Sequence, residues 1–163
     1  TNVAVVANSA RRRDSRTPQA LFECASACVE ILRQVRDSGV VVLDDAMEIL
    51  DEYRRNLSPS GQPGVGDAFF KWLWSNQANP TKCLRVAIHR LKGETREYAE
   101  FPASPELERF DRSDRKFVAV ALASGRKPLV LDATDRDWWE FRLPLRRHGL
   151  RLKFLCPDLV SDR

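Results

Sequence analysis

The stretch VVVLDD, residues 40–45, decides the fold. Its apolar residues follow one another without polar alternation, which is typical of a strand covered on both faces in a parallel sheet. A second stretch, PLVLDATDRDWW at 128–139, repeats the pattern of a short apolar run followed by aspartates. Because ligands bind at the carboxyl ends of parallel strands, we expect both sets of acids at the ligand-binding edge of one sheet.

Helical patterns around these strands predict an alternating α/β chain. A helix is predicted from Pro18 to Gly39, with others after Asp44, over 67–79, after Asp111 and up to about His148. A strand is predicted at 84–91, an edge strand at 150–155, a loop at 58–66 and a short apolar element at 3–10. The sequence therefore predicts one α/β domain over residues 1–163 with a mostly parallel sheet.

The composition is that of an ordinary globular chain with a mild basic excess. Its 163 residues include 27 Lys+Arg and 23 Asp+Glu, which gives a net charge of +4. This excess suits a polyanionic partner, although many proteins without one share it. No run approaches the roughly 20 apolar residues of a membrane span. The basic cluster Arg11–Arg13 follows the apolar residues 3–10, which is the wrong order for a signal peptide.

The four cysteines form no CxxC pair. Cys24 and Cys28 lie one helical turn apart among apolar neighbours, so buried free thiols are favoured over a zinc site. Cys83 and Cys156 stand alone in the sequence. Free thiols are typical of a reducing compartment, and the sequence therefore favours a cytoplasmic protein.

The stretch FDRSDRKFVAVALASG, residues 110–125, opens a helix with two aspartates, and the second is followed directly by two cations. Asp111 and Asp114 suit a helix start, because carboxylates cap free N–H groups and favour the positive end of the helix dipole. Arg115 and Lys116 in the same turn oppose that dipole. Either the aspartates are only caps, or they belong to a site that holds negative charge in a positive surrounding.

A divalent cation would explain acids gathered at one sheet edge. Right-handed crossovers place the helix start at 111–114 on the same edge as the acids after the two apolar strands. Carboxylates close together raise one another's pKa unless a cation is present. Mg²⁺ or Mn²⁺ is the expected cofactor, because both prefer oxygen ligands and Mg²⁺ keeps several waters beside a phosphate substrate. For each single aspartate, a helix cap or a solvated charge remains the alternative.

Four segments together resemble the PIN-domain nucleases: DEYRRNL at 51–57, FDRSDRKFVAVALA at 110–123, LVLDATDRDWWEF at 129–141 and GLRLKFLCP at 149–157. The resemblance covers nearly the whole chain and is weakest at 58–109. It implies a three-layer α/β/α sandwich around a mostly parallel sheet. It also implies acidic side chains that use a divalent metal to cut single-stranded RNA.

The resemblance also assigns site residues. Glu52, Asp114 and Asp135 correspond to the catalytic acids and metal ligands, and Asp137 follows as a further ligand. The family begins with a strand that ends in Asp-x-Asn, and TNVAVVANSA matches from its threonine. That places the family's aspartate immediately before Thr1, with the first strand ahead of it. Asn2 and Asp132 are then expected just behind the ligands, and the catalytic hypothesis requires an acid before Thr1.

Contacts with nucleic acid are predicted for Arg115, Lys116 and Arg136, because cations beside the acids can hold a phosphodiester. Arg11–Arg13 and Arg146–Arg147 are either further phosphate contacts or solvated charges. Trp138 and Trp139 either stack on a base or belong to the core. His89 and His148 lack the spacing of metal ligands and are expected at the surface.

Two functions of different classes follow. The first is a Mg²⁺- or Mn²⁺-dependent endoribonuclease that cleaves single-stranded RNA, as a toxin or in RNA processing or defence, with a protein inhibitor or partner subunit as a further expectation. The alternative is a nuclease-dead PIN-like module that binds RNA or a protein partner. Cleavage of DNA or of branched structures is disfavoured, because flap nucleases carry more acids and a helical arch that this sequence lacks.

Overall fold

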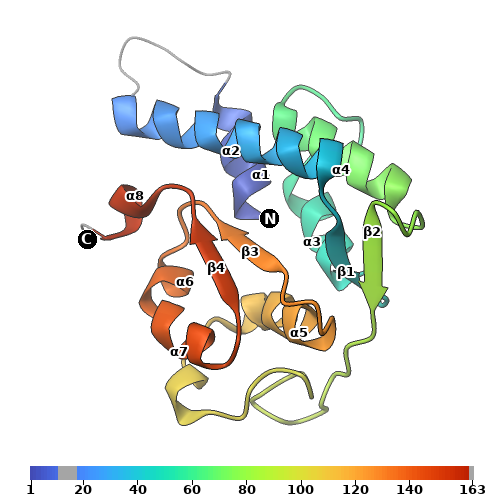
Figure 1. Cartoon of the computed structure of the whole chain (residues 1–163), viewed down its shortest axis with the longest axis vertical. Coiled ribbons are helices and arrows are strands. Elements are labelled where there is room, and N and C mark those ends of the chain that lie inside the picture. Colours follow the sequence, from blue (N-terminus) through green and yellow to red (C-terminus); the bar gives the residue numbers. More distant parts are fainter. Residues whose placement is uncertain (11–17, 162–163) are drawn as a thin grey trace.

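The computed structural model describes residues 1–10 and 18–161 (Figure 1). Its first half contains α1 (Asn2–Ser9), α2 (Gln19–Ser38), β1 (Val41–Asp44), α3 (Glu48–Asn56), α4 (Val65–Asn76) and β2 (Cys83–Val86). Its second half contains α5 (Arg115–Ala123), β3 (Leu129–Asp132), α6 (Arg136–Glu140), α7 (Arg142–Arg147), β4 (Arg151–Phe154) and α8 (Pro157–Ser161). Two 3₁₀ turns, Pro105–Leu107 and Arg112–Asp114, precede α5. The basic run Arg11–Arg13 lies outside the described residues.

Both strand pairs are parallel, as the two apolar runs predict. β1 pairs with β2 from Val41↔Cys83 to Asp44↔Val86, and β3 pairs with β4 from Leu129↔Arg151 to Asp132↔Phe154. In the described part of the chain these pairs form two separate two-stranded sheets. The structure thus confirms a mixed α/β chain with parallel strands. β1 and β3 each end in an aspartate.

Element bounds differ from the prediction where the sequence lacks a clear period. Residues 3–10, expected as a short apolar element, belong mostly to helix α1. The strand expected at 84–91 is limited to Cys83–Val86, and the last helix is divided into α6 and α7 at Phe141. The C-terminal helix α8 is not predicted by the sequence pattern.

Small residues let α1 pack closely against α4. Ala4 and Ala7 are fully buried, and a Cβ atom on Gly66 would lie 1.9 Å from the carbonyl oxygen of Ala4. Glycine is therefore required at position 66. The side-chain oxygen of Asn8 accepts hydrogen bonds from the backbone N–H groups of Gly66 and Asp67, at 2.8 and 3.3 Å. These contacts fix α1, and with it Thr1 and Asn2, relative to α4.

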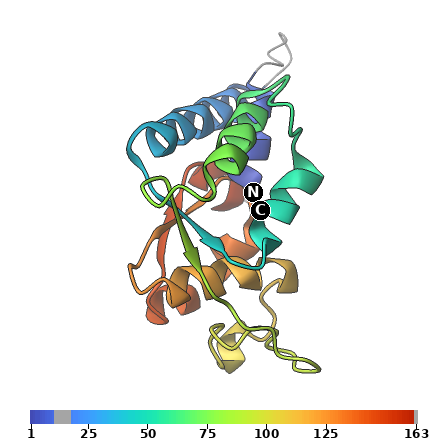
Figure 2. The same ribbon diagram turned by 90° about the vertical axis from the view of Figure 1, so that its right-hand side faces the viewer.

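The helices and loops at the two ends of the molecule enclose the strands between them. Two perpendicular views place α2 and α4 at one end and the segment around the 3₁₀ turn Pro105–Leu107 at the other (Figures 1 and 2). The strands and α5 lie between these ends, and the N-terminus lies close to them. No described helix is both long and apolar enough to cross a membrane.

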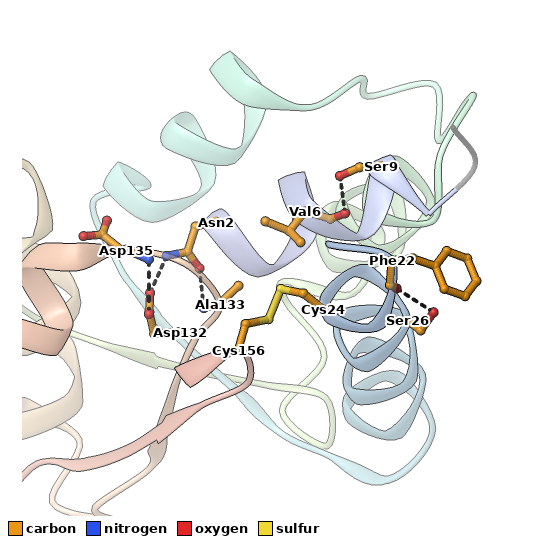
Figure 3. Close-up of a disulfide and its surroundings, with 10 residues drawn as sticks. All are labelled: Asn2, Val6, Ser9, Phe22, Cys24, Ser26, Asp132, Ala133, Asp135 and Cys156. Carbon is orange, nitrogen blue, oxygen red and sulfur yellow. Dashed lines mark hydrogen bonds between the residues drawn. A yellow bond between two sulfur atoms is a disulfide. The ribbon is translucent and has the colours of Figure 1, made fainter. Parts of the chain in front are cut away.

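The four cysteines form one disulfide and two free thiols, which differs in part from the prediction. Cys24 on α2 and Cys156 before α8 form a disulfide across 132 residues (Figure 3). Cys28 is a buried free thiol, as predicted, and burial raises its pKa to about 12. Cys83, for which no state was predicted, is also a buried free thiol. The prediction was wrong for Cys24, because helical spacing shows only local neighbours, whereas Cys156 reaches α2 through the tertiary fold.

Candidate functional site

Four carboxylates, Glu52, Asp114, Asp132 and Asp135, form what we call the acid cluster. They come from α3, the 3₁₀ turn before α5, the end of β3 and the N-cap of α6. Asp135 and Glu52 both raise the pKa of Asp114, and Asp135 raises that of Asp132. Electrostatic interactions therefore link the four residues, although Glu52 and Asp114 lie far in the sequence from Asp132 and Asp135.

Asp114 faces the acid cluster rather than capping its helix. It occupies the N-cap position of α5, but its side chain makes no capping hydrogen bond. Its Oδ2 instead accepts a hydrogen bond from the indole N–H of Trp138 at 2.9 Å. Burial, reinforced by Asp135 and Glu52, raises the pKa of Asp114 to about 7. A carboxylate so perturbed by burial and like charge is typical of a functional site.

Asp111, by contrast, is an exposed cap. Its Oδ1 accepts a hydrogen bond from the backbone N–H of Ser113 at 2.7 Å. Asp44, after the other strand, has a similar structural role, because it accepts from the N–H groups of Glu48 and Ile49 at 2.7 and 2.9 Å. The two alternatives for the aspartates are therefore divided between residues: Asp111 and Asp44 cap helices, whereas Asp114 belongs to the acid cluster.

Asn2 holds Asp132 at the end of β3. Its side-chain amide donates to Asp132 Oδ1, and its carbonyl oxygen accepts from the N–H of Ala133 at 3.2 Å (Figure 3). The other oxygen of Asp132 accepts from the N–H of Asp135 at 3.3 Å. Burial raises the pKa of Asp132 to about 6, and the Asn2 hydrogen bond opposes this shift. Asn2 thus orients Asp132, and the place of both residues behind metal ligands stays a prediction.

Asp135 and Asp137 lie together at the start of α6. Asp135 Oδ1 accepts a hydrogen bond from the N–H of Asp137 at 3.0 Å. Burial raises the pKa of Asp135, and the neighbouring carboxylate of Asp137 adds to the shift. Asp137 therefore adds a fifth negative charge at the border of the acid cluster.

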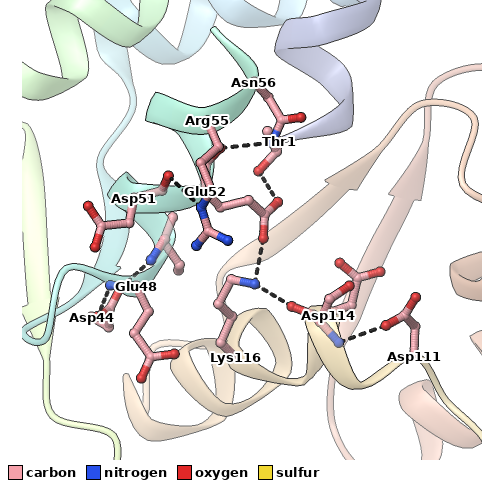
Figure 4. Close-up of polar contacts among 12 residues, drawn as sticks. Thr1, Asp44, Glu48, Asp51, Glu52, Arg55, Asn56, Asp111, Asp114 and Lys116 are labelled. Carbon is pink, nitrogen blue, oxygen red and sulfur yellow. Dashed lines mark hydrogen bonds and ion pairs between the residues drawn. The ribbon is translucent and has the colours of Figure 1, made fainter.

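Glu52 lies on the α3 side of the acid cluster. One oxygen accepts a hydrogen bond from the Thr1 hydroxyl, and the other lies 2.5 Å from the Lys116 ammonium (Figure 4). The backbone nitrogen of Thr1 is buried, and Glu52, Asp114 and Asp132 are among the charged groups that act on it. The backbone of Thr1 therefore lies among the acids.

Two of the three predicted nucleic-acid contacts need correction. Arg115 is only 3% exposed, and its guanidinium donates to the carbonyl oxygens of Thr95, Glu108 and Phe110. Lys116 is 7% exposed and is paired with Glu52. The first turn of α5 directs both side chains inward, so neither presents its charge to solvent. Arg136 is exposed, paired with Glu140 at 2.6 Å, and remains accessible to a phosphate.

Three contacts around the acids were not predicted from the sequence. Glu48, one turn before Glu52, accepts hydrogen bonds from Arg90 (2.7 and 2.9 Å) and from the Tyr98 hydroxyl. These bonds attach the loop after β2 to α3, beside the acid cluster. Trp138 is a buried core residue that also orients Asp114. A glutamate at i−4 from Glu52 was the only sequence signal for Glu48, and it is a weak one.

The side-chain ligands available in the acid cluster are oxygen atoms, which fit a hard divalent cation such as Mg²⁺ or Mn²⁺. Among the described residues, the one trio whose ligand atoms all lie within 4.8 Å of one another is Cys24, Cys28 and Cys156. No three carboxylates of the acid cluster come this close together in the described residues. His89 and His148 are exposed, as predicted.

Comparison of the chain with family models, with curated proteins and with solved structures finds no match. Function is therefore inferred from the acid cluster. Its central features are a helix-start aspartate that does not cap, an amide that orients a second aspartate, and a glutamate delivered from another helix.

Proposed function

We propose that this chain is a metal-dependent endoribonuclease that cleaves phosphodiester bonds in single-stranded RNA with Mg²⁺ or Mn²⁺, as the PIN-domain nucleases do. The observation that carries the proposal is the environment of Asp114. Its carboxylate makes no capping hydrogen bond, and the neighbouring carboxylates of Asp135 and Glu52 raise its pKa further. Such a concentration of negative charge is costly unless it has a cation to hold.

In this proposal the residues of the acid cluster and its neighbours have separate roles. Glu52, Asp114 and Asp135 hold the cation, with Asp137 beside them, while Asn2 and Trp138 orient Asp132 and Asp114. A bound divalent ion would activate water and stabilise the leaving oxygen of a phosphodiester. Arg136, exposed at the start of α6, is placed to contact a backbone phosphate.

A slot between the two separate sheets supports the PIN-like arrangement. A cavity of about 370 Å³ is bordered by residues 41–43 of β1, residues 129–131 of β3 and Thr1. Helices α2, α3, α4 and α5 also contribute to its apolar lining. β1 and β3 each have one paired edge, and in the described chain the other edge has no strand partner. We propose that a parallel strand leading into Thr1 fills this slot and completes a five-stranded, three-layer sandwich.

Hydrogen exchange tests whether a strand fills the slot. The amides of β1 and β3 are expected to exchange about ten-fold or more slowly in the full-length protein than in a version that starts at Thr1, because a central strand would pair with both edges. Amides of α2 are the internal control, since helix hydrogen bonds do not depend on the slot. Equal protection of β1 and β3 in both proteins would contradict a filling strand.

A residue joined to Thr1 would enter the acid cluster, because the Thr1 backbone already lies there. An acid at that position favours the enzyme, as the resemblance implies. The alternative is a nuclease-dead module that binds RNA or a protein partner. One observation favours this second candidate: the Lys116 ammonium already neutralises Glu52.

Metal-dependent cleavage separates the two candidates. The full-length protein is expected to cut single-stranded RNA in Mg²⁺ or Mn²⁺ and to lose this activity in a chelator, because the acids then lack their cation. Glu52→Gln should reduce cleavage by on the order of 100-fold, as for other principal electrostatic groups. Asp51→Asn is the matched control, since Asp51 is adjacent but pairs with Arg54 at the surface. RNA binding without cleavage would instead support the nuclease-dead module.

A further inference from the structure

Lys116 holds an unusual position for a lysine. Its ammonium lies 2.5 Å from Glu52 Oε2 and donates to the carbonyl oxygen of Ser113 (Figure 4). The side chain is 9% exposed, and the Glu52 side chain is 19% exposed. The pair joins the first turn of α5 to α3 across the acid cluster. A lysine is rarely buried to this extent without a partner that needs its charge.

The local charges explain why Lys116 is buried there. Glu52, Asp114, Asp132 and Asp135 gather in this region, and Glu48 lies near enough for Lys116 to lower its pKa. Arg115, the next cation along α5, turns away and donates to loop carbonyls. Arg136 is exposed and paired with Glu140. Of these three cations, Lys116 alone has its charge among the acids.

A divalent ion at Glu52 must compete with this ammonium. The oxygen that lies 2.5 Å from Nζ is one of the two that Glu52 can offer, and the other accepts from Thr1. Two cations at the same carboxylate also repel each other, more strongly when one is divalent and the surroundings exclude water. The ammonium and a metal ion therefore cannot both be held closely by Glu52.

We propose that Lys116 is an internal counter-cation, which holds Glu52 in place without metal and is displaced from it when a divalent ion binds. This role rests on the proposed function, because it concerns the metal affinity of the same acids. It makes Lys116 a positioning residue that sets how tightly the ion is held. It also accounts for a basic residue in a helix turn where a cation opposes the helix dipole.

Mn²⁺ binding to the full-length protein tests the role of Lys116. Lys116→Met keeps most of the apolar stem of the side chain and removes its charge, and Lys116→Gln is a second neutral variant. Both are expected to bind Mn²⁺ at least ten-fold more tightly in calorimetric titrations, because the competing charge is gone. Without metal both should melt at a lower temperature than the wild type, and saturating Mn²⁺ should remove most of that difference. Lys71→Met, an exposed change on α4, controls for the loss of one positive charge.

The outcomes separate this inference from the proposed function. If the wild type binds Mn²⁺ and the Lys116 variants bind it equally or more weakly, the counter-cation role is wrong while the metal site stands. If neither the wild type nor the variants bind Mn²⁺, the metal-dependent function and the counter-cation role both fail. In a Glu52→Gln background, Lys116→Met should give little gain in affinity, and a full gain there would show that Lys116 does not act through Glu52.

Discussion

Asp114→Asn is expected to reduce Mg²⁺- or Mn²⁺-dependent RNA cleavage by on the order of 100-fold or more, while the protein folds normally. Asparagine has nearly the same shape, and its side-chain oxygen can still accept the hydrogen bond from Trp138. No capping bond is lost, because the Asp114 side chain makes none. In the proposed metal site the substitution removes a full negative charge from a ligand of a hard cation, which an amide oxygen replaces poorly.

The same variant should be more stable than the wild type in metal-free buffer at pH 8. The pKa of Asp114 rises from 3.8 to about 7 on folding, so folding favours the protonated acid. The contribution of the protonated Asp114 side chain to the free energy of unfolding is fully present below about pH 4. It is lost as the pH rises through 7. After allowance for solvent screening, we expect the free energy of unfolding of Asp114→Asn to exceed that of the wild type by about 2 kcal/mol at pH 8. Almost no difference is expected at pH 4, and urea denaturation measures both values.

Asp111→Asn is the matched control for both measurements. Asp111 lies in the same 3₁₀ turn, is exposed, and caps through Oδ1, which asparagine does equally well. Its cleavage rate and its stability should stay close to those of the wild type. A well-folded Asp114→Asn protein that still cleaves RNA at the wild-type rate would reduce Asp114 to a structural residue and remove the main support for a nuclease.

The parallel strands and the place of Asp132 could be predicted because both depend on short-range patterns. An unbroken apolar run marks a strand covered on both faces, and an aspartate that follows it must lie at the ligand-binding edge. No local sequence pattern distinguishes Glu52 from its neighbours. It lies within α3, and only the resemblance to a nuclease family drew attention to it. Its contact with Lys116 spans 64 positions along the chain, so no local pattern contains it.

Side-chain direction was the part that the sequence could not provide. Arg115 and Lys116 look like surface cations beside acids, and a phosphate contact was the natural prediction. The helix starts only at Arg115, after a 3₁₀ turn, so the first two residues of α5 face inward and bury their charges. The Cys24–Cys156 disulfide was missed for the same reason, since its partners meet only in the folded chain.

Arg115→Met is expected to destabilise the protein by on the order of 3 kcal/mol, because buried carbonyls that lose a charged donor cost about 1–3 kcal/mol each. The Arg115 guanidinium donates to the carbonyls of Thr95, Glu108 and Phe110, and it lies 4.9 Å from the centre of the Phe101 ring. A single side chain thus ties the loop before α5 to the helix. A chain of this size should melt roughly 6–12 °C lower.

Arg136→Met separates this structural role from RNA contact. Arg136 is an exposed cation with one surface ion pair, so its loss should change the free energy of unfolding by less than about 0.5 kcal/mol. It should instead weaken RNA binding at low salt, because a phosphate contact would be lost. Arg115→Lys should recover little of the lost stability, since an ammonium cannot match the planar fork that reaches three carbonyls. If Arg115→Met left stability unchanged and weakened RNA binding, the arginine would be a nucleic-acid contact after all, and the inward orientation of the first turn of α5 would be wrong.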